Sequence, residues 1–261
     1  GLFFLNDYNN EAPKHLTTYF DDVIEFISFL GNRQSGAVGL PNVIIWAYWF
    51  WKKDVEEGYY IKNPEYYLKQ NFQKFIFRLN QPFMRIDQSA FTNVSIFDRR
   101  YIENLFGGLE FPDGTFAVDC IEEIMTAQKM FMEVVSETRE TAMFTYPVLT
   151  YSLLYNYETD TFEDEEFARW ASKHNIQWSD SNFFISDQLG TLSNCCRLLS
   201  QTDKLAGNTP KQRIAERLHG LVLCKVKPES LALFLLLGNL SSIYYEIVTC
   251  RVCIADSYHI W

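Results

Sequence analysis

Cysteine, long apolar runs and positive charge are all scarce in this sequence. Six cysteines among 261 residues are too few for a disulfide-stapled secreted fold. The apolar run over residues 231–237, like the other apolar runs of the sequence, is much shorter than the roughly 20 residues that span a bilayer. The formal net charge of −10 disfavours binding to nucleic acid or to an anionic membrane surface. Because no secretory signal opens the chain, we expect a reducing, cytoplasmic setting.

The spacings that mark common metal and phosphate sites are also missing. The four histidines show no HxxxH or HExxH spacing, so the sequence has no zinc-hydrolase motif. Cys250 and Cys253 form a CxxC pair without a second one, so no zinc or redox site is predicted there. The glycines of SGAVGLP, residues 35–41, fit no phosphate-binding pattern, and a tight helix-to-helix connection explains them.

The sequence is rich in the hydrophobic and aromatic residues that form a large core. Hydrophobic residues make up 48% of it and aromatic residues 16%, enough for one large domain or two small ones. Gly1 stands where an initiator methionine is expected, so we expect a piece of a longer protein. Residues 1–199 carry 16 Lys and Arg against 28 Asp and Glu, whereas residues 200–261 carry 7 against 5. This change predicts a boundary near Ser200.

Helical and strand patterns alternate in the first part of the chain. Apolar spacing predicts helices over residues 16–30, 118–135 and 164–175. Runs of aromatic and β-branched residues predict strands over 88–97, 144–155 and 182–186. Strands separated by helices of this length favour parallel pairing with crossover helices, in an α/β sheet or barrel.

Two adjacent cysteines, Cys195 and Cys196, lie in SNCCRLLS, residues 193–200. Buried free cysteines often act only as small hydrophobes, which is one explanation of the pair. The other is reactivity, because the pair follows a strand and a polar connection, where loops present functional groups. Arg197 would favour a thiolate, whereas a radical mechanism needs the neutral thiol, and the spacing leaves both open.

Six blocks of the sequence resemble the anaerobic (class III) ribonucleoside-triphosphate reductase family. In order along the chain from about Gly31 to Ser200, they are FLGNRQSGAVGLPN, IDQSAFTNVSIFDRRYIENLFGGLEFPDG, EEIMTAQKMFMEVVSETRE, FTYPVLTYSLLY, DEEFARWASKHNIQWSDSNFFISD and SNCCRLLS. The resemblance implies the ten-stranded α/β barrel of glycyl-radical enzymes, with a finger loop in its centre. Residues 1–200 would form an incomplete part of that catalytic barrel, and residues 201–261 a divergent tail.

The resemblance also implies roles for individual residues. SNCCRLL is similar to the finger loop, whose tip carries the cysteine that becomes a thiyl radical, matched here to Cys196 or else to Cys195. Asn182 is a candidate for an asparagine near the substrate. Four residues of QSAFTN either donate hydrogen bonds to substrate or satisfy neighbouring backbone: Gln88, Ser89, Thr92 and Asn93.

The family implies partners and cofactors that this sequence does not itself supply. Substrates would be ribonucleoside triphosphates, with dNTP and ATP as effectors, a radical-SAM activase and a homodimeric assembly. The glycyl radical loop, the structural four-cysteine zinc site, a second barrel cysteine and an ATP cone find no match in these residues, so no metal ligand is predicted. We therefore expect the chain alone to complete no turnover. The reductant, formate or a dithiol protein, stays open.

Two other interpretations fit parts of the sequence. Pyruvate formate-lyase-like glycyl radical enzymes also present adjacent cysteines on a barrel loop, although the blocks GAVGLPN and QSAFTNVSIFDRR favour the reductase. A remnant that only binds nucleotide or forms a dimer is the non-catalytic alternative, and the missing glycyl loop supports it.

Overall fold

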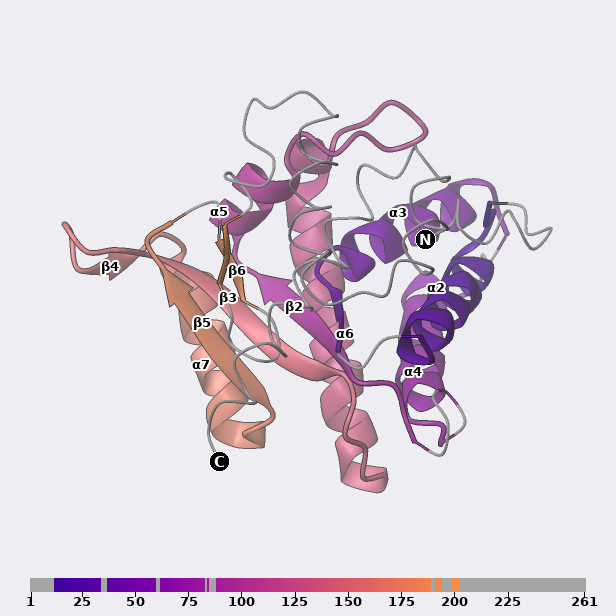
Figure 1. Cartoon of the computed structure of the whole chain (residues 1–261). Helices are drawn as coiled ribbons and strands as arrows, with labels where there is room; N and C mark the ends of the chain where they lie inside the picture. The colour runs from indigo at the N-terminus through magenta and orange to yellow at the C-terminus, as the bar shows by residue number, and fades with distance from the viewer. Residues whose placement is uncertain are drawn as a thin grey trace, which may run out of the picture.

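A mainly parallel sheet forms the centre of the molecule (Figure 1). The computed structural model describes residues 12–33, 37–59, 62–82, 84, 88–188, 191–193 and 199–201. Four parallel strands follow the order β1 (Val38–Leu40), β2 (Thr92–Phe97), β3 (Val148–Asn156) and β5 (Ser181–Ser186). The predicted α/β class and its parallel pairing are confirmed.

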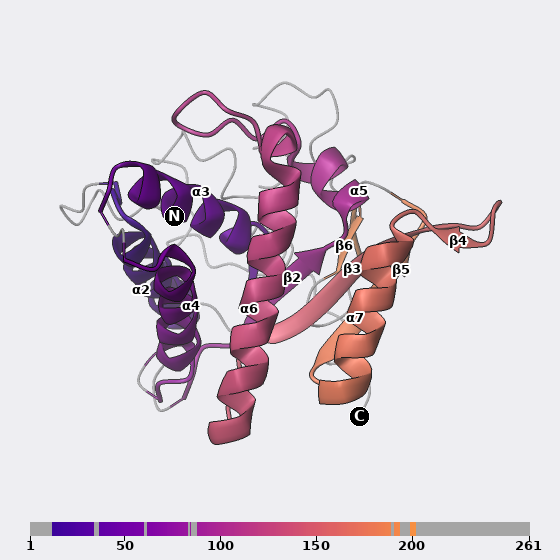
Figure 2. The ribbon, with the colours of Figure 1, turned by 180° about the vertical axis from the view of Figure 1, so that it is seen from behind.

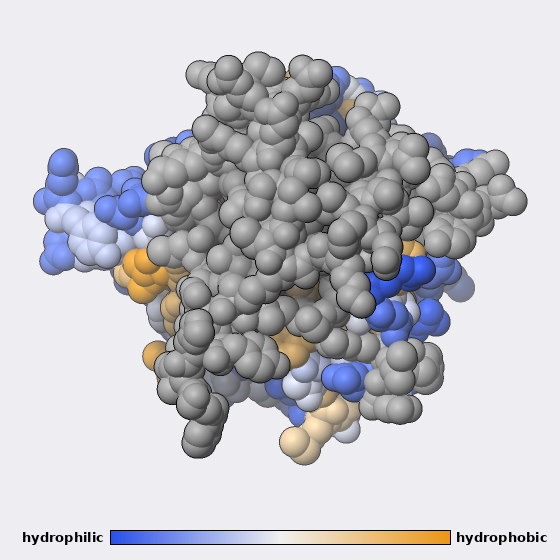
Figure 3. All heavy atoms as spheres, viewed as in Figure 1, coloured by the Kyte–Doolittle hydropathy of each residue, from blue (hydrophilic) through white to orange (hydrophobic). Residues whose placement is uncertain are grey.

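Three short strands pair antiparallel. β4 (Thr161–Phe162) pairs with the end of β3, and this hairpin projects from the sheet with a hydrophilic surface (Figures 1 and 3). β6 (Thr191–Ser193) and β7 (Leu199–Gln201) form a separate two-stranded sheet, in which β6 contacts β3.

The helices lie in two groups. Within the described ranges, the α-helices are α2 (Leu16–Gly31), α3 (Val43–Glu56), α4 (Pro64–Leu79), α5 (Arg99–Tyr101), α6 (Ile121–Thr141) and α7 (Glu165–Trp178). α6 and α7 cover one face of the sheet, as the view from behind shows (Figure 2). α2, α3 and α4 contact one another beside this layer, and α3 and α4 also contact α6. No helix of the described ranges has the length and apolarity needed to cross a bilayer.

Local sequence explains where α4 and α7 begin. Asn63 accepts a hydrogen bond from the backbone N–H of Tyr66 at 3.0 Å, and Pro64 occupies the first helical position, where its missing N–H costs nothing. Asp164 caps α7 in the same way by accepting from the N–H of Phe167 at 3.0 Å. The aspartate that opens this helix therefore has a structural role.

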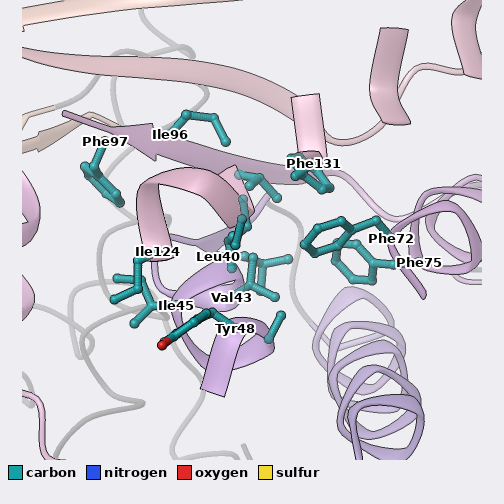
Figure 4. Close-up of a cluster of buried hydrophobic side chains, with 14 of the residues drawn as sticks. Leu40, Val43, Ile45, Tyr48, Phe72, Phe75, Ile96, Phe97, Ile124 and Phe131 are labelled. Carbon is teal, nitrogen blue, oxygen red and sulfur yellow. The ribbon is translucent and has the colours of Figure 1, made fainter. Parts of the chain in front are cut away.

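The main core lies between the sheet and the helices. Phe131 of α6 packs edge-on against Phe72 of α4, with ring centroids 5.1 Å apart, and both are fully buried. Figure 4 shows these rings beside Phe75 and Val43, with Ile96 of β2 nearby. This cluster fixes the position of the parallel strands relative to the helical layers.

Several predicted boundaries are wrong. The helix predicted from residue 118 begins at Ile121 and runs to Thr141, so Val118 lies outside it and is 47% exposed. The strand predicted from residue 144 begins at Val148, because the N–H groups of Thr145 and Tyr146 bond to the Asn80 side chain instead.

The predictions for two other segments also need correction. The strand predicted over residues 88–97 is confined to Thr92–Phe97. SGAVGLP is more than a connection, because Val38–Leu40 forms β1 and pairs with β2. Helices α3 and α4 were not predicted, and residues 202–261, the expected tail, lie outside the described ranges.

Candidate functional site

The sheet has two chemically different faces. Tyr151 of β3 packs against Phe167 and Trp170 of α7, so its face of the sheet is the one that the helices cover. Side chains alternate along each strand, and parallel register partners share a face. The opposite side of the sheet carries a group of five polar side chains, which we call the polar face: Asn93, Ser95, Thr150, Ser152 and Asn182. By the same alternation, this side also carries Asn156 and Ser186 near the strand ends and four apolar residues, Phe97, Val148, Leu154 and Phe184.

Ser95, Thr150 and Asn182 form a continuous row across the polar face. Ser95 is the register partner of Thr150, which is in turn the partner of Asn182, so three adjacent strands each contribute one residue. Ser95 and Thr150 are buried, whereas Asn182 is partly exposed. The row thus begins in the interior and is open to solvent at β5.

Asn93 ties β2 to β3 at the edge of this row. Its Nδ2 donates to the carbonyl oxygen of Val148 at 3.0 Å and to Oγ1 of Thr150 at 3.1 Å. The sequence left two roles open for Asn93, and this contact with a neighbouring backbone carbonyl is the second of them. It also orients the Thr150 hydroxyl, because that oxygen now serves as an acceptor within the sheet.

Ser152 stands apart from the other members of the polar face. Its register partners are Phe97 on β2 and Phe184 on β5, so aromatic residues flank it on both sides. The side chain is fully buried, and its Oγ has no hydrogen-bond partner within the described structure. Buried hydroxyls are nearly always bonded, so this one calls for an explanation.

The remaining predicted site residues are scattered. Thr92 belongs to the helix-covered face by alternation along β2, opposite to Asn93. Gln88, which is exposed, and Ser89, which is half-buried, precede the strand. Cys195 and Cys196 lie outside the described residues, between β6 and β7 in the sequence. The structure therefore brings together only Asn93 and Asn182 among the described candidates.

Asp98, directly after β2, is a buried carboxyl group that the sequence reasoning missed. It accepts from the N–H groups of Tyr101 at 2.8 Å and Leu154 at 2.6 Å. Burial raises the pKa of Asp98 to about 6, against the lowering effect of these hydrogen bonds. Its oxygens bond the backbone at the start of α5 and near the end of β3, so we assign Asp98 a structural role.

A second polar cluster, centred on the half-buried His174, lies on the helix-covered face. His174 of α7 contacts Ser136 Oγ through Nε2 at 2.9 Å and the hydroxyl of Tyr151 through Nδ1 at 3.1 Å. Burial lowers the pKa of His174, which keeps the imidazole neutral at pH 7. This chain of contacts links α6, α7 and β3, and it lies on the side of the sheet away from the polar face.

No grouping of three or more His, Cys, Asp or Glu side chains suited to a metal ion occurs in the part of the chain that the structure describes. The five residues of the polar face carry only hydroxyl and amide groups, and the phenylalanines on the same side of the sheet, Phe97 and Phe184, are apolar. The signal for it was present in the sequence as the alternation of small polar with apolar residues in TNVSIF and VLTYSLLY. Those patterns do not tell which face the helices cover.

Comparison with protein families identifies one match. The family described as anaerobic ribonucleoside-triphosphate reductase matches residues 1–241. The match therefore includes the Cys195-Cys196 pair and continues beyond Ser200. The comparison with curated protein sequences yields no match.

Solved structures similar to this chain come from Thermotoga maritima. An anaerobic ribonucleotide reductase in complex with dATP and CTP is 40% identical to this chain, with a TM-score of 0.68. The match covers 77% of this chain and 33% of the solved chain. The structure with dATP bound in the specificity site is 44% identical, with a TM-score of 0.66. That match covers 69% of this chain and 30% of the solved chain. The chain thus spans about a third of the length of these relatives.

Proposed function

Because this chain belongs to the anaerobic ribonucleoside-triphosphate reductase family, we propose that the protein containing it reduces ribonucleoside triphosphates to deoxyribonucleotides. The observation that carries the proposal is the family match over residues 1–241, reinforced by 40–44% identity to solved reductases. The chain spans about a third of those structures. We therefore assign the activity to the whole protein and propose that the 261 residues alone are inactive.

The proposed architecture is part of a ten-stranded barrel with the Cys195-Cys196 segment as its finger loop. Two features support it. α6 and α7 lie on one face of the four parallel strands (Figures 1 and 2), and the opposite side holds the five residues of the polar face, as suits the lining of a barrel that receives a polar substrate. The hairpin strand β6 that precedes the cysteines contacts β3, the central strand of the polar face.

In the proposed mechanism, Cys196 acts as a hydrogen-atom carrier, with Cys195 as the alternative. The Cys196 thiol would give its hydrogen atom to the glycyl radical of the family, so that the S–H bond breaks, a C–H bond forms on the glycine, and the sulfur is left as a radical. The sulfur takes the 3′ hydrogen atom of the ribose, forming S–H as C3′–H breaks, and the protonated 2′ hydroxyl leaves as water. A reductant, formate or a dithiol, adds two electrons and a proton, and Cys196 returns its hydrogen atom to C3′.

Asn93 and Asn182 are the residues that we propose to contact the substrate, because both belong to the polar face. The Asn182 amide can donate and accept hydrogen bonds, whereas Asn93, whose Nδ2 donates within the sheet, offers its Oδ1 as an acceptor. Neither side chain introduces a charge near the radical. Enclosure of this region would exclude water and protect the radical while it is in contact with the sugar. The structural zinc of the family has no matching ligand set in the described part of the chain, so no step depends on it.

Product analysis tests the proposal. The protein containing this chain, activated anaerobically by a radical-SAM activase, should convert ribonucleoside triphosphates to deoxyribonucleotides in the presence of formate or a dithiol. The 261-residue chain under the same conditions should give none. Cleavage of pyruvate with coenzyme A instead would identify the pyruvate formate-lyase-like alternative, and nucleotide binding without either product would identify a non-catalytic remnant.

A further inference from the structure

The polar face is uncharged, and this limits what it can bind. Strands β2, β3 and β5 contain no Lys, Arg, Asp or Glu, so they offer no partner for the triphosphate of a nucleotide. Their hydroxyl and amide groups can each donate and accept hydrogen bonds. The part of a ribonucleotide with the same chemistry is the ribose, whose 2′ and 3′ hydroxyls are neutral donors and acceptors.

Ser152 supplies an independent sign of a missing ligand. Its Oγ is buried between the register positions of Phe97 and Phe184 and has no hydrogen-bond partner in the described structure. An alanine at position 152 would occupy nearly the same space and would avoid the free-energy cost of burying an unpaired hydroxyl. Nothing in the packing of β3 explains the serine, whereas a ligand hydroxyl at this position would satisfy it.

Thr150 extends the same argument along β3. Its Oγ1 accepts from Asn93 Nδ2 at 3.1 Å, which leaves the hydroxyl hydrogen available for another acceptor. Residues 150 and 152 are two apart on one strand and therefore face the same side, with Cα atoms about 6.5 Å apart. Two hydroxyls at this separation suit a small polyol that lies along the strand.

We infer that Ser152 and Thr150 bind the ribose hydroxyls of the ribonucleotide, while the triphosphate is bound by residues outside these strands. The inference rests on the proposed function and adds to it two residues that determine sugar specificity. Because Asn182 is partly exposed, we expect the ribose to approach from the β5 side and to uncover Ser152 as it binds.

Calorimetric titration of the full 261-residue chain tests the inference. Ser152→Ala should raise the Kd for ribonucleoside triphosphates roughly 3- to 10-fold, the value of one neutral hydrogen bond. Thr150→Val should act in the same direction. Both variants should bind inorganic triphosphate as the wild type does, and the loss should be the same for all four bases, since the contact is with the sugar.

Thr138→Val is the matched control. Thr138 is also buried, and its Oγ1 also has no partner among the described residues, but it lies on α6, behind the helix-covered face. Thr138→Val should leave every Kd unchanged. Thermal denaturation should show that Ser152→Ala is at least as stable as the wild type, since Ser152 Oγ makes no bond that the substitution could break.

Three results would overturn the inference. The first is a Ser152→Ala chain that binds ribonucleotides as tightly as the wild type. The second is an equal loss for inorganic triphosphate, which would indicate a general disturbance of the sheet. The third is a wild-type chain that binds no ribonucleotide. In that case the proposed function would still stand if the whole protein formed deoxyribonucleotides.

Discussion

Asp54 joins three helices, and its removal should destabilise the fold strongly. The side chain is fully buried in α3. Its Oδ1 lies 2.7 Å from His15 Nδ1, and its Oδ2 accepts from the N–H of Leu16 at 2.8 Å and from the hydroxyl of Tyr67 at 2.9 Å. These contacts connect α3 to the start of α2 and to α4, the layer beside the sheet.

The expected loss follows from what the substitution leaves unpaired. Asp54→Ala removes the carboxyl group that accepts from two buried donors, the N–H of Leu16 and the hydroxyl of Tyr67, which should cost about 3–5 kcal/mol. Asp54→Asn keeps one carbonyl oxygen for Leu16 and Tyr67, and its amide can donate to a neutral His15. Its cost should therefore be smaller, about 1–2 kcal/mol.

Urea denaturation followed by far-UV circular dichroism at pH 7 measures both losses. Asp187→Ala is the control, because Asp187 is exposed after β5, and its removal should change the free energy of unfolding by less than about 0.5 kcal/mol. A cost below about 1 kcal/mol for Asp54→Ala, or a larger cost for Asp54→Asn than for Asp54→Ala, would refute the reasoning.

Three further predictions concern the core and two buried titratable groups. Phe131→Ala should lower the free energy of unfolding by about 3–5 kcal/mol in urea, because the ring is fully buried against Phe72; a loss under 1 kcal/mol would contradict the packing. The raised pKa of Asp98, about 6, means that the folded state binds its proton more tightly than the unfolded state. The free energy of unfolding of the wild type relative to Asp98→Asn should therefore fall by about 2 kcal/mol between pH 4 and 7, and a flat difference would argue against the raised pKa. The lowered pKa of His174 makes stability depend on pH in the opposite direction. The contribution of neutral His174 to the free energy of unfolding is complete above pH 6.5 and is lost as the pH falls through the folded pKa. Wild type should lose stability between pH 7.5 and 5.5 relative to His174→Gln, which does not titrate; parallel curves would count against the lowered pKa of His174.

Amphipathic periodicity was enough to predict the surface helices. α2 and α7 bury one stripe each, and apolar spacing marks both in the sequence. α3 is apolar along most of its length and buried on several sides, so no helical stripe distinguishes it. α4 does show buried residues at helical spacing and could have been predicted.

Long-range pairing explains the other errors. β1 is only three residues long and becomes a strand because Val38 pairs with Thr92, more than fifty positions away. No local pattern in SGAVGLP reports that partner. In the same way, the hydroxyl of Ser152 has no unusual sequence context, and its isolation appears only once β2 and β5 place phenylalanines on both sides.

The candidate cysteines illustrate the opposite case. Cys195 and Cys196 were identified by resemblance to a family, and the family match over residues 1–241 includes them. Their roles stay predictions. The polar face, by contrast, was found through register and burial, and only Asn93 and Asn182 of its five members were candidates from the sequence.

Deoxyribonucleotide formation by cysteine variants of the whole protein tests the central claim most directly. Under anaerobic activation, with glycyl radical content checked by electron paramagnetic resonance, the account predicts no product from Cys196→Ala, although the radical still forms. Cys195→Ala should retain product formation. Undiminished product from Cys196→Ala would contradict the assignment of the hydrogen-atom carrier, and loss only in Cys195→Ala would transfer that role to Cys195.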